Sequence, residues 1–130
     1  MEMITAEAAE NRDEIKTLNA PMTAAAKASA FMELTKPRIA IMLVLTSAAG
    51  FYLGTGAGGF NWVLFLNAMA GITLLAFGVA ALNQYWERDL DKLMERTATR
   101  PLPQGRLNST EALIFGVLLC AGAEIYLALA

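Results

Sequence analysis

The chain has 130 residues, of which 56% are hydrophobic and 17% charged, with a mean hydropathy of +0.45, a net charge of -2, one cysteine and no histidine. Soluble domains have about a quarter of their residues charged, disordered chains are less apolar, and nucleic-acid-binding modules are basic, so the composition argues against all three classes. Cys120 has no second cysteine with which to form an internal disulfide, and without histidine it cannot complete a zinc site. Any chemistry must therefore use carboxylates, amides, basic side chains or an oxygen-bound metal.

The first 30 residues are expected to form a flexible cytosolic tail. They are too acidic for a mitochondrial presequence, and they lack the apolar core of a signal peptide. The acidic residues are Glu2, Glu7, Glu10, Asp13 and Glu14. We therefore place the folded domain at residues 31–130.

A long uncharged stretch follows this tail. The 44 residues from Ile39 to Leu82 contain no Asp, Glu, Lys or Arg, whereas roughly 20 apolar residues suffice to cross a bilayer. The stretch therefore predicts two membrane-spanning helices, over residues 38–56 and 62–83. The glycine-rich segment Gly54–Gly59 supplies the sharp reversal between them.

A third span is predicted over residues 111–130, because the preceding segment Asn108-Ser109-Thr110 consists of residues that favour the start of a helix. The predicted fold is therefore an all-α integral membrane protein with three transmembrane helices. Basic residues lie before the first span and after the second, but not in the glycine-rich loop, so the positive-inside rule places both basic segments in the cytoplasm. They are Lys27, Lys36 and Arg38 before the first span, and Arg88, Lys92, Arg96, Arg100 and Arg106 after the second.

The cytoplasmic segment 83–107 carries most of the polar side chains. If the second helix continues into it, Asn83, Glu87 and Asp91 recur at i, i+4 and i+8 on one face, which Glu95 would extend. The same spacing recurs on a neighbouring face with the basic residues Arg88, Lys92 and Arg96. Like charges four residues apart destabilise a solvated helix. The separation of acidic and basic side chains onto two faces therefore favours a helix that binds a cation and an anion over one that is merely solvated. The natural pair is magnesium on the oxygen-bearing face and a phosphate group that bridges it to the basic face.

These motifs resemble those of a known family. The pattern Asn83-x-x-x-Glu87-x-x-x-Asp91, followed by Arg96-Thr97-x-x-Arg100-Pro101-Leu102-Pro103-x-Gly105, is similar to the first acidic motif of the UbiA family of intramembrane prenyltransferases. The segments Leu34-Thr35-Lys36-Pro37-Arg38 and Trp86–Thr97 most resemble the branch of that family that farnesylates heme. The resemblance extends over residues 31–130.

The resemblance implies that a farnesyl group passes from farnesyl diphosphate to heme B, giving heme O, with magnesium as cofactor, in the bacterial inner membrane. In this family the diphosphate lies at the cytoplasmic mouth of a helical bundle and the prenyl tail enters an apolar tunnel. The implied metal ligands are Asn83, Glu87 and Asp91, and the implied diphosphate-binding residues are Asn83, Arg88, Lys92, Lys36 and Arg38. Arg96 and Arg100 are the implied catalytic residues, which stabilise the departing diphosphate.

Several alternatives stay open. Family members that prenylate aromatic acceptors such as 4-hydroxybenzoate share the spacing of Asn83, Glu87 and Asp91. The protein could also be a small membrane protein without enzymatic activity, although such a protein would not need these oxygen-bearing side chains on one face. For Lys36 and Arg38, the positive-inside rule by itself explains their position. A transporter should carry ionisable groups inside the first two spans, which have none. Because the family has more helices and a second acidic motif, we expect this chain to be the N-terminal part of a larger bundle and to be inactive alone.

Overall fold

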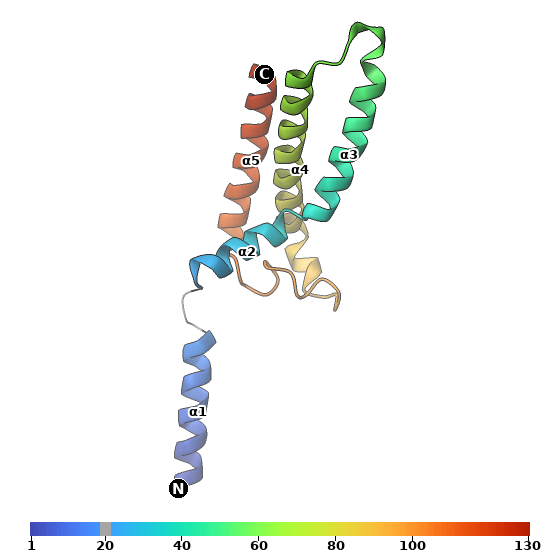
Figure 1. Ribbon diagram of the computed structural model, residues 1–130. Helices are drawn as coiled ribbons and strands as arrows, with labels where there is room; N and C mark the ends of the chain where they lie inside the picture. Colours follow the sequence, from blue (N-terminus) through green and yellow to red (C-terminus); the bar gives the residue numbers. More distant parts are fainter. Residues whose placement is uncertain (19–21) are drawn as a thin grey trace.

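The computed structural model describes residues 1–18 and 22–130, and this part of the chain consists of helices, turns and irregular segments with no strand. The helices are α1 (Glu2–Leu18), α2 (Ala24–Leu34), α3 (Pro37–Gly54), α4 (Trp62–Asp91) and α5 (Ser109–Leu129), with a short 3-10 turn at Gly56–Gly58. Figure 1 shows α3, α4 and α5 running alongside one another, α2 crossing one end of this bundle, and α1 standing apart.

Three of these helices, α3, α4 and α5, are long and apolar enough to cross a membrane, which confirms the predicted all-α membrane fold. The main difference from prediction lies at the end of α4. The span was predicted to end at residue 83, but the helix continues to Asp91, because no glycine or proline interrupts that stretch. The connecting segment therefore begins at Lys92 rather than at Asn83.

The first 30 residues, expected to be a flexible tail, instead include α1 and most of α2. Alanine has the highest helix propensity, and the alanine-rich α2 also has an N-cap, because the Thr23 hydroxyl accepts a hydrogen bond from the Ala26 amide at 3.3 Å. The last turns of α2 are tied to the bundle, since Ala30 and Leu34 are buried in one apolar cluster with Ala81, Leu102, Leu107 and Ala112. This cluster closes the end of the bundle that α2 crosses.

A sharp bend separates α2 from α3. Lys36 adopts a left-handed backbone conformation, with φ 47° and ψ 63°, and Pro37 begins the next helix. A non-glycine residue in this region costs about 1–3 kcal/mol of strain, so the surrounding contacts must hold it there. The Thr35 hydroxyl donates to the Met32 carbonyl at 2.7 Å, and the Gln84 amide nitrogen donates to the Leu34 carbonyl at 3.3 Å. These bonds fix the bend and leave the Lys36 side chain beside the end of α4.

Close packing joins α4 to α5. A Cβ atom added at Gly78 would lie 2.8 Å from the Cys120 backbone nitrogen and 3.0 Å from the Gly116 carbonyl oxygen. Small residues allow the helix backbones to approach this closely, as is common in membrane proteins. The far ends of α4 and α5 are also joined, because the Tyr126 hydroxyl donates to the Asn67 side chain. The pair α4 and α5 therefore forms the tightest part of the bundle.

The opposite end of the α3–α4 hairpin is closed by aromatic side chains. Phe51 packs against Phe65 with ring centroids 5.4 Å apart, and Phe60 lies 5.1 Å from Phe65. The chain reverses there through Gly56 and Gly59, whose positive φ angles of 48° and 88° suit glycine. The predicted reversal at Gly54–Gly59 thus agrees with the structure, and aromatic packing holds this end of the two helices together.

Candidate functional site

The oxygen-bearing side chains lie on the last turns of α4. Because α4 continues to Asp91, Asn83, Glu87 and Asp91 lie on one face of the helix. Asp91 is buried, with 5% of its surface exposed, and Glu87 is half-buried. Glu95 does not extend this face, because it lies beyond the end of the helix. The acidic site therefore has two carboxylates and one amide.

Arg100 connects the two carboxylates. Its Nη1 atom donates to both Asp91 oxygens, at 2.9 and 2.8 Å, and lies 3.6 Å from Glu87 Oε2. The connecting segment folds back to allow this, since the buried Thr97 hydroxyl donates to the Asp91 carbonyl at 2.9 Å and closes the end of α4. One cationic position thus contacts both carboxylates at once.

A cleft of about 420 Å³ opens beside this pair. Three cations line it, namely Lys36, Arg38 and Arg100, together with Glu33, whose carboxylate is paired with Arg106. Burial lowers the pKa of Lys36 below its usual range, and the charge of Arg100 adds to this effect, whereas Glu87 and Asp91 oppose it. Lys36 is therefore held close to charges of both signs. A cleft with three converging cations is suited to an anion that brings several negative charges.

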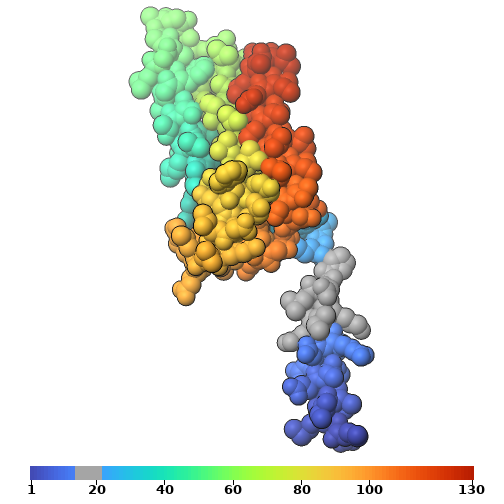
Figure 2. Space-filling view, turned by 180° about the vertical axis from the view of Figure 1, so that it is seen from behind, coloured from blue at the N-terminus to red at the C-terminus, as the bar shows by residue number. Residues whose placement is uncertain are grey.

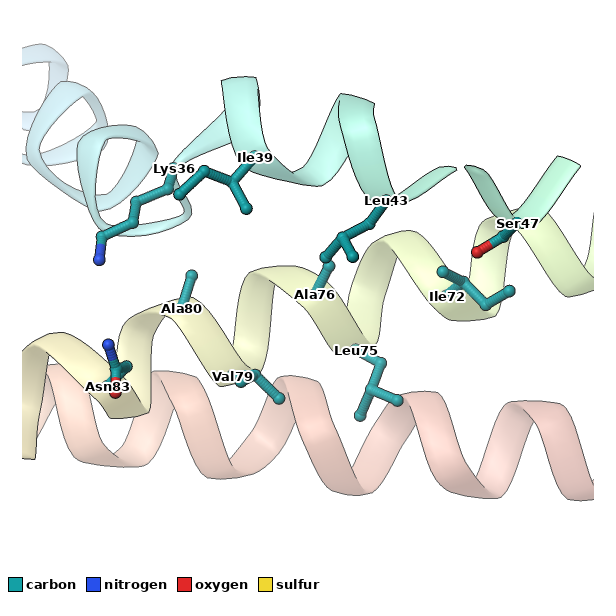
Figure 3. Close-up of a pocket in the computed structure, with 10 residues that line it drawn as sticks. All are labelled: Lys36, Ile39, Leu43, Ser47, Ile72, Leu75, Ala76, Val79, Ala80 and Asn83. Atoms are coloured by element: carbon teal, nitrogen blue, oxygen red, sulfur yellow. The ribbon is translucent and has the colours of Figure 1, made fainter. Parts of the chain in front are cut away.

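An apolar groove of about 370 Å³ runs from this cleft between α3 and α4 (Figure 3). Lys36 and Asn83 lie at one end of the groove, and Ser47 and Ile72 lie at the other. Its walls are aliphatic, with Leu43, Ala76 and Ala80 in the middle section. Lys36 and Ile39 line both the cleft and the groove, so the two spaces meet. Together they match a ligand with an anionic head and an apolar tail.

Three of the predicted basic residues lie away from both spaces. Arg88 donates to the Tyr85 carbonyl at 2.7 Å and stacks over the Tyr85 ring at 4.4 Å. Arg88 and Lys92 lie 3.9 and 3.7 Å from Asp89, and Arg96 is exposed. Because α4 ends at Asp91, the expected basic stripe through Arg88, Lys92 and Arg96 does not form on one helix. The cations that face the acidic pair come from the α2–α3 bend and from Arg100.

Sequence reasoning did not identify Gln84. Its side chain is 2% exposed, its nitrogen donates to the Leu34 carbonyl, and it also lines the cleft. Its Oε1 atom is buried without a hydrogen-bond partner among the described residues. The only sequence signal was an amide at the polar end of an apolar helix, next to Asn83. Gln84 therefore joins the α2–α3 bend to the wall of the site.

The connecting segment is held in place by ion pairs with the helices around it. Arg106 donates to both oxygens of Glu33 at 2.9 and 2.8 Å, and Lys27 donates to Glu111 at 2.8 Å. The hydrogen bond from Arg106 lowers the pKa of Glu33. Figure 2 shows the end of α4 and this segment together covering the end of the bundle. These contacts keep Arg100 within reach of Asp91.

The donor set is compatible with magnesium. Among the side chains that the structure describes, in residues 1–13 and 22–130, no three from Asp, Glu, His or Cys gather around one point. Magnesium, however, is commonly bound through one or two carboxylates together with the phosphates of a substrate. Glu87 and Asp91 supply the two carboxylates, and the Nη1 atom of Arg100 lies within 4 Å of both. The amide of Asn83 lies on the same face of α4.

The fold and the site define a multi-pass helical membrane protein with an acidic and basic cleft that leads into an apolar groove. Residues 42–130 match the UbiA prenyltransferase family, and the chain belongs to this family. It is 45% identical to "Protoheme IX farnesyltransferase" of Erythrobacter litoralis over 89 residues, which cover 68% of this chain and 28% of the relative. No solved structure matches the chain.

Two further relatives carry similar names. The chain is 43% identical to "Protoheme IX farnesyltransferase" of Solibacter usitatus over 98 residues, covering 68% of this chain and 33% of the relative. It is 39% identical to "Protoheme IX farnesyltransferase 1" of Pseudomonas fluorescens over 97 residues, covering 75% of this chain and 32% of the relative. The chain therefore spans about a third or less of the length of these relatives.

Proposed function

We propose that this chain carries the diphosphate-binding part of a magnesium-dependent prenyltransferase that moves a farnesyl group from farnesyl diphosphate to heme B, giving heme O. The observation that supports this most directly is the cationic cleft beside two carboxylates, joined to an apolar groove. Farnesyl diphosphate has the matching chemistry, an anionic head on an apolar tail. The names of the relatives support heme as the acceptor.

Each part of the site has a proposed role. Asn83, Glu87 and Asp91 hold magnesium, which when bound neutralises charge on the diphosphate leaving group. Lys36, Arg38 and Arg100 bind the diphosphate oxygens, because these three cations line the cleft. The groove holds the prenyl tail in an apolar surrounding. Arg88, Lys92 and Arg96 lie outside the cleft, so we assign the diphosphate contacts to the first three cations.

The reaction begins when the bond between the allylic carbon and the diphosphate oxygen breaks and its electron pair leaves with the diphosphate. Negative charge grows on the diphosphate at this point, and fixed cations stabilise it most strongly in a site from which water is excluded. A vinyl group of heme B then supplies the electron pair of the new carbon–carbon bond. The cation that remains on the acceptor is discharged by losing a proton, or by adding water that then loses a proton. The contribution of this chain is to bind the donor and stabilise its leaving group.

Binding of farnesyl diphosphate to the chain in lipid nanodiscs, measured calorimetrically with and without magnesium, tests this proposal. We expect magnesium-dependent binding that Asp91→Asn weakens more than about a hundredfold, because even outer-shell partners of a metal contribute about 10- to 100-fold. Asp89→Asn is the matched control, since Asp89 lies two residues away and is exposed. Equal affinity in both variants, or binding indifferent to magnesium, would contradict the metal assignment.

We further propose that the cleft faces the cytoplasm and that the protein resides in a bacterial inner membrane. The end of α4 and the segment that connects it to α5 carry five basic residues, namely Arg88, Lys92, Arg96, Arg100 and Arg106. The loop between α3 and α4, at the opposite end of the bundle, has no charged residue. This asymmetry supports the orientation through the positive-inside rule. The orientation can be measured by introducing Gly58→Cys into a Cys120→Ser background and labelling intact cells with a thiol reagent that does not cross the membrane. We expect the cysteine to be labelled from outside, and its protection would contradict the proposed orientation.

A further inference from the structure

The groove between α3 and α4 has a defined far end. Its last lining residues are Ser47 on α3 and Ile72 on α4 (Figure 3). Phe51 lies one turn beyond Ser47, and Phe65 lies two turns beyond Ile72, each on the same face of its helix. The rings of Phe51 and Phe65 are in contact, with centroids 5.4 Å apart. Aromatic side chains therefore fill the space between the helices directly beyond the groove.

This aromatic plug, defined as Phe51, Phe60 and Phe65, is held together by three ring contacts. The centroids of Phe51 and Phe60 are 5.7 Å apart, and those of Phe60 and Phe65 are 5.1 Å apart. Edge-to-face contacts of this kind add about 0.5–1.5 kcal/mol each beyond area burial. Trp62 packs on Phe60 from the outside at 4.8 Å. All three rings of the plug are half-buried, and the plug is anchored from both helices and from the loop.

The length of the groove can be compared with that of a prenyl chain. Asn83 and Ile72 are eleven residues apart on α4, which is about 16 Å at about 1.5 Å per helical residue. An extended chain advances about 1.1–1.2 Å per bond, the extended peptide repeat divided by its three backbone bonds. The roughly twelve main-chain bonds of farnesyl then measure about 14 Å, and the roughly sixteen of geranylgeranyl about 18 Å. Farnesyl fits the groove, and geranylgeranyl exceeds it.

We propose that the aromatic plug, with Ser47 at its edge, limits the bound donor to farnesyl length. This inference rests on the proposed function, because it requires a prenyl diphosphate whose head lies near Lys36 and Asn83. A shorter geranyl chain leaves the far section of the groove empty and loses apolar contact there. A longer chain must displace Phe51 or Phe65, or leave the groove. Phe51, Phe65 and Ser47 are thus the specificity-determining residues of the donor site.

The test measures how tightly the chain in nanodiscs binds geranyl, farnesyl and geranylgeranyl diphosphate in the presence of magnesium. We expect farnesyl diphosphate to bind at least about tenfold more tightly than either of the others, since even one methylene discriminates by about 10-fold or more. Phe51→Ala and Phe65→Ala should each open the end of the groove and remove the preference against geranylgeranyl diphosphate. Ser47→Phe should shorten the groove and shift the preference to geranyl diphosphate.

Two neighbouring residues provide matched controls. Thr46 and Leu53 are exposed and do not line the groove, so Thr46→Phe and Leu53→Ala should keep the farnesyl preference. An unchanged length preference in Phe51→Ala, Phe65→Ala and Ser47→Phe overturns the inference, as does a wild-type chain that binds all three lengths equally. Failure of the proposed function looks different, because then no prenyl diphosphate binds in a magnesium-dependent way.

Discussion

At the scale of single residues, Arg100 has the most informative position in the molecule. The same Nη1 atom contacts Asp91 and Glu87, while Lys36 lies close enough for these charges to influence its pKa. The guanidinium also lines the cationic cleft. A metal bound at the carboxylates would therefore compete with Arg100, whereas an anion bound in the cleft would be attracted by it.

Arg100→Gln should consequently change two affinities in opposite directions. Magnesium alone should bind roughly tenfold more tightly, about 1.4 kcal/mol, because a competing cation is removed from the carboxylates. Farnesyl diphosphate should bind roughly tenfold more weakly at saturating magnesium, because a cation is lost from the cleft. Calorimetry with each ligand measures both, and Arg12→Gln in α1 controls for the change in net charge. A parallel change in both affinities would show that Arg100 supports only the fold.

Lys36 predicts a pH dependence. Its lowered pKa means that its ammonium group loses its proton at a lower pH than an ordinary lysine does. A bound diphosphate favours the protonated form, so farnesyl diphosphate affinity should fall as pH rises, and this fall should begin below the pH at which an ordinary lysine titrates. Lys36→Arg should flatten this profile, since a guanidinium stays charged throughout that pH range. If the wild-type chain and Lys36→Arg show the same dependence of farnesyl diphosphate affinity on pH, Lys36 does not contact the diphosphate.

At the scale of the helices, the glycines sort into packed and unpacked positions. The Cβ position of Gly78 meets the backbone of α5, whereas no atom lies within 4 Å of a Cβ placed at Gly122. Gly78→Ala should therefore destabilise the protein by about 1–3 kcal/mol through overpacking. Gly122→Ala should be neutral or stabilising by up to about 1 kcal/mol, because alanine favours helix. Thermal unfolding in detergent, followed by circular dichroism, compares the two, and equal melting temperatures would contradict the packing.

The helices themselves were largely predictable, because charge-free length and cap chemistry depend on local sequence. Asn108 does cap α5, with its side chain accepting from the Thr110 amide at 3.3 Å. The sequence did not decide whether α4 extends to Asp91, because the apolar pattern of the helix ends near Leu82. The helix α2 was missed because its burial depends on Leu102 and Leu107, more than sixty residues away in sequence.

The candidate site was predictable in part for the same reason. The spacing of Asn83, Glu87 and Asp91 is a property of one helix, so the shared face follows directly. The partner of Asp91 was not predictable from spacing, because the turns after α4 decide whether Arg96 or Arg100 returns to it. The turn stabilised by Thr97 selects Arg100. The sequence marked Gln84 only as an amide at the polar end of an apolar helix, since its burial depends on the bend at Lys36.

At the scale of the whole molecule, the donor site of this chain can be tested in a chimera. Residues 31–130 would replace the corresponding segment of the Erythrobacter litoralis relative, whose matched region is 45% identical. We expect membranes containing the chimera to convert heme B to heme O with farnesyl diphosphate and magnesium. Asp91→Asn in the chimera should abolish the product, and Asp89→Asn should not.

The outcomes of this experiment distinguish the alternatives. Absence of any transfer, with normal insertion, would favour a non-enzymatic membrane protein. The chain alone is expected to be inactive in the same assay, because its groove is lined by only α3, α4 and the bend at Lys36.

The length of α4 has a consequence for how a ligand reaches the cleft. Its 30 residues measure about 45 Å, which exceeds a hydrocarbon core of about 30 Å. We therefore expect its last turns, with Glu87 and Asp91, to stand at the level of the lipid headgroups, and the groove runs from that end between α3 and α4. An amphiphilic ligand would then arrive by lateral diffusion within one leaflet. Occupancy then follows the mole fraction of ligand in the bilayer, so added inert lipid empties the site even when the total ligand concentration is constant.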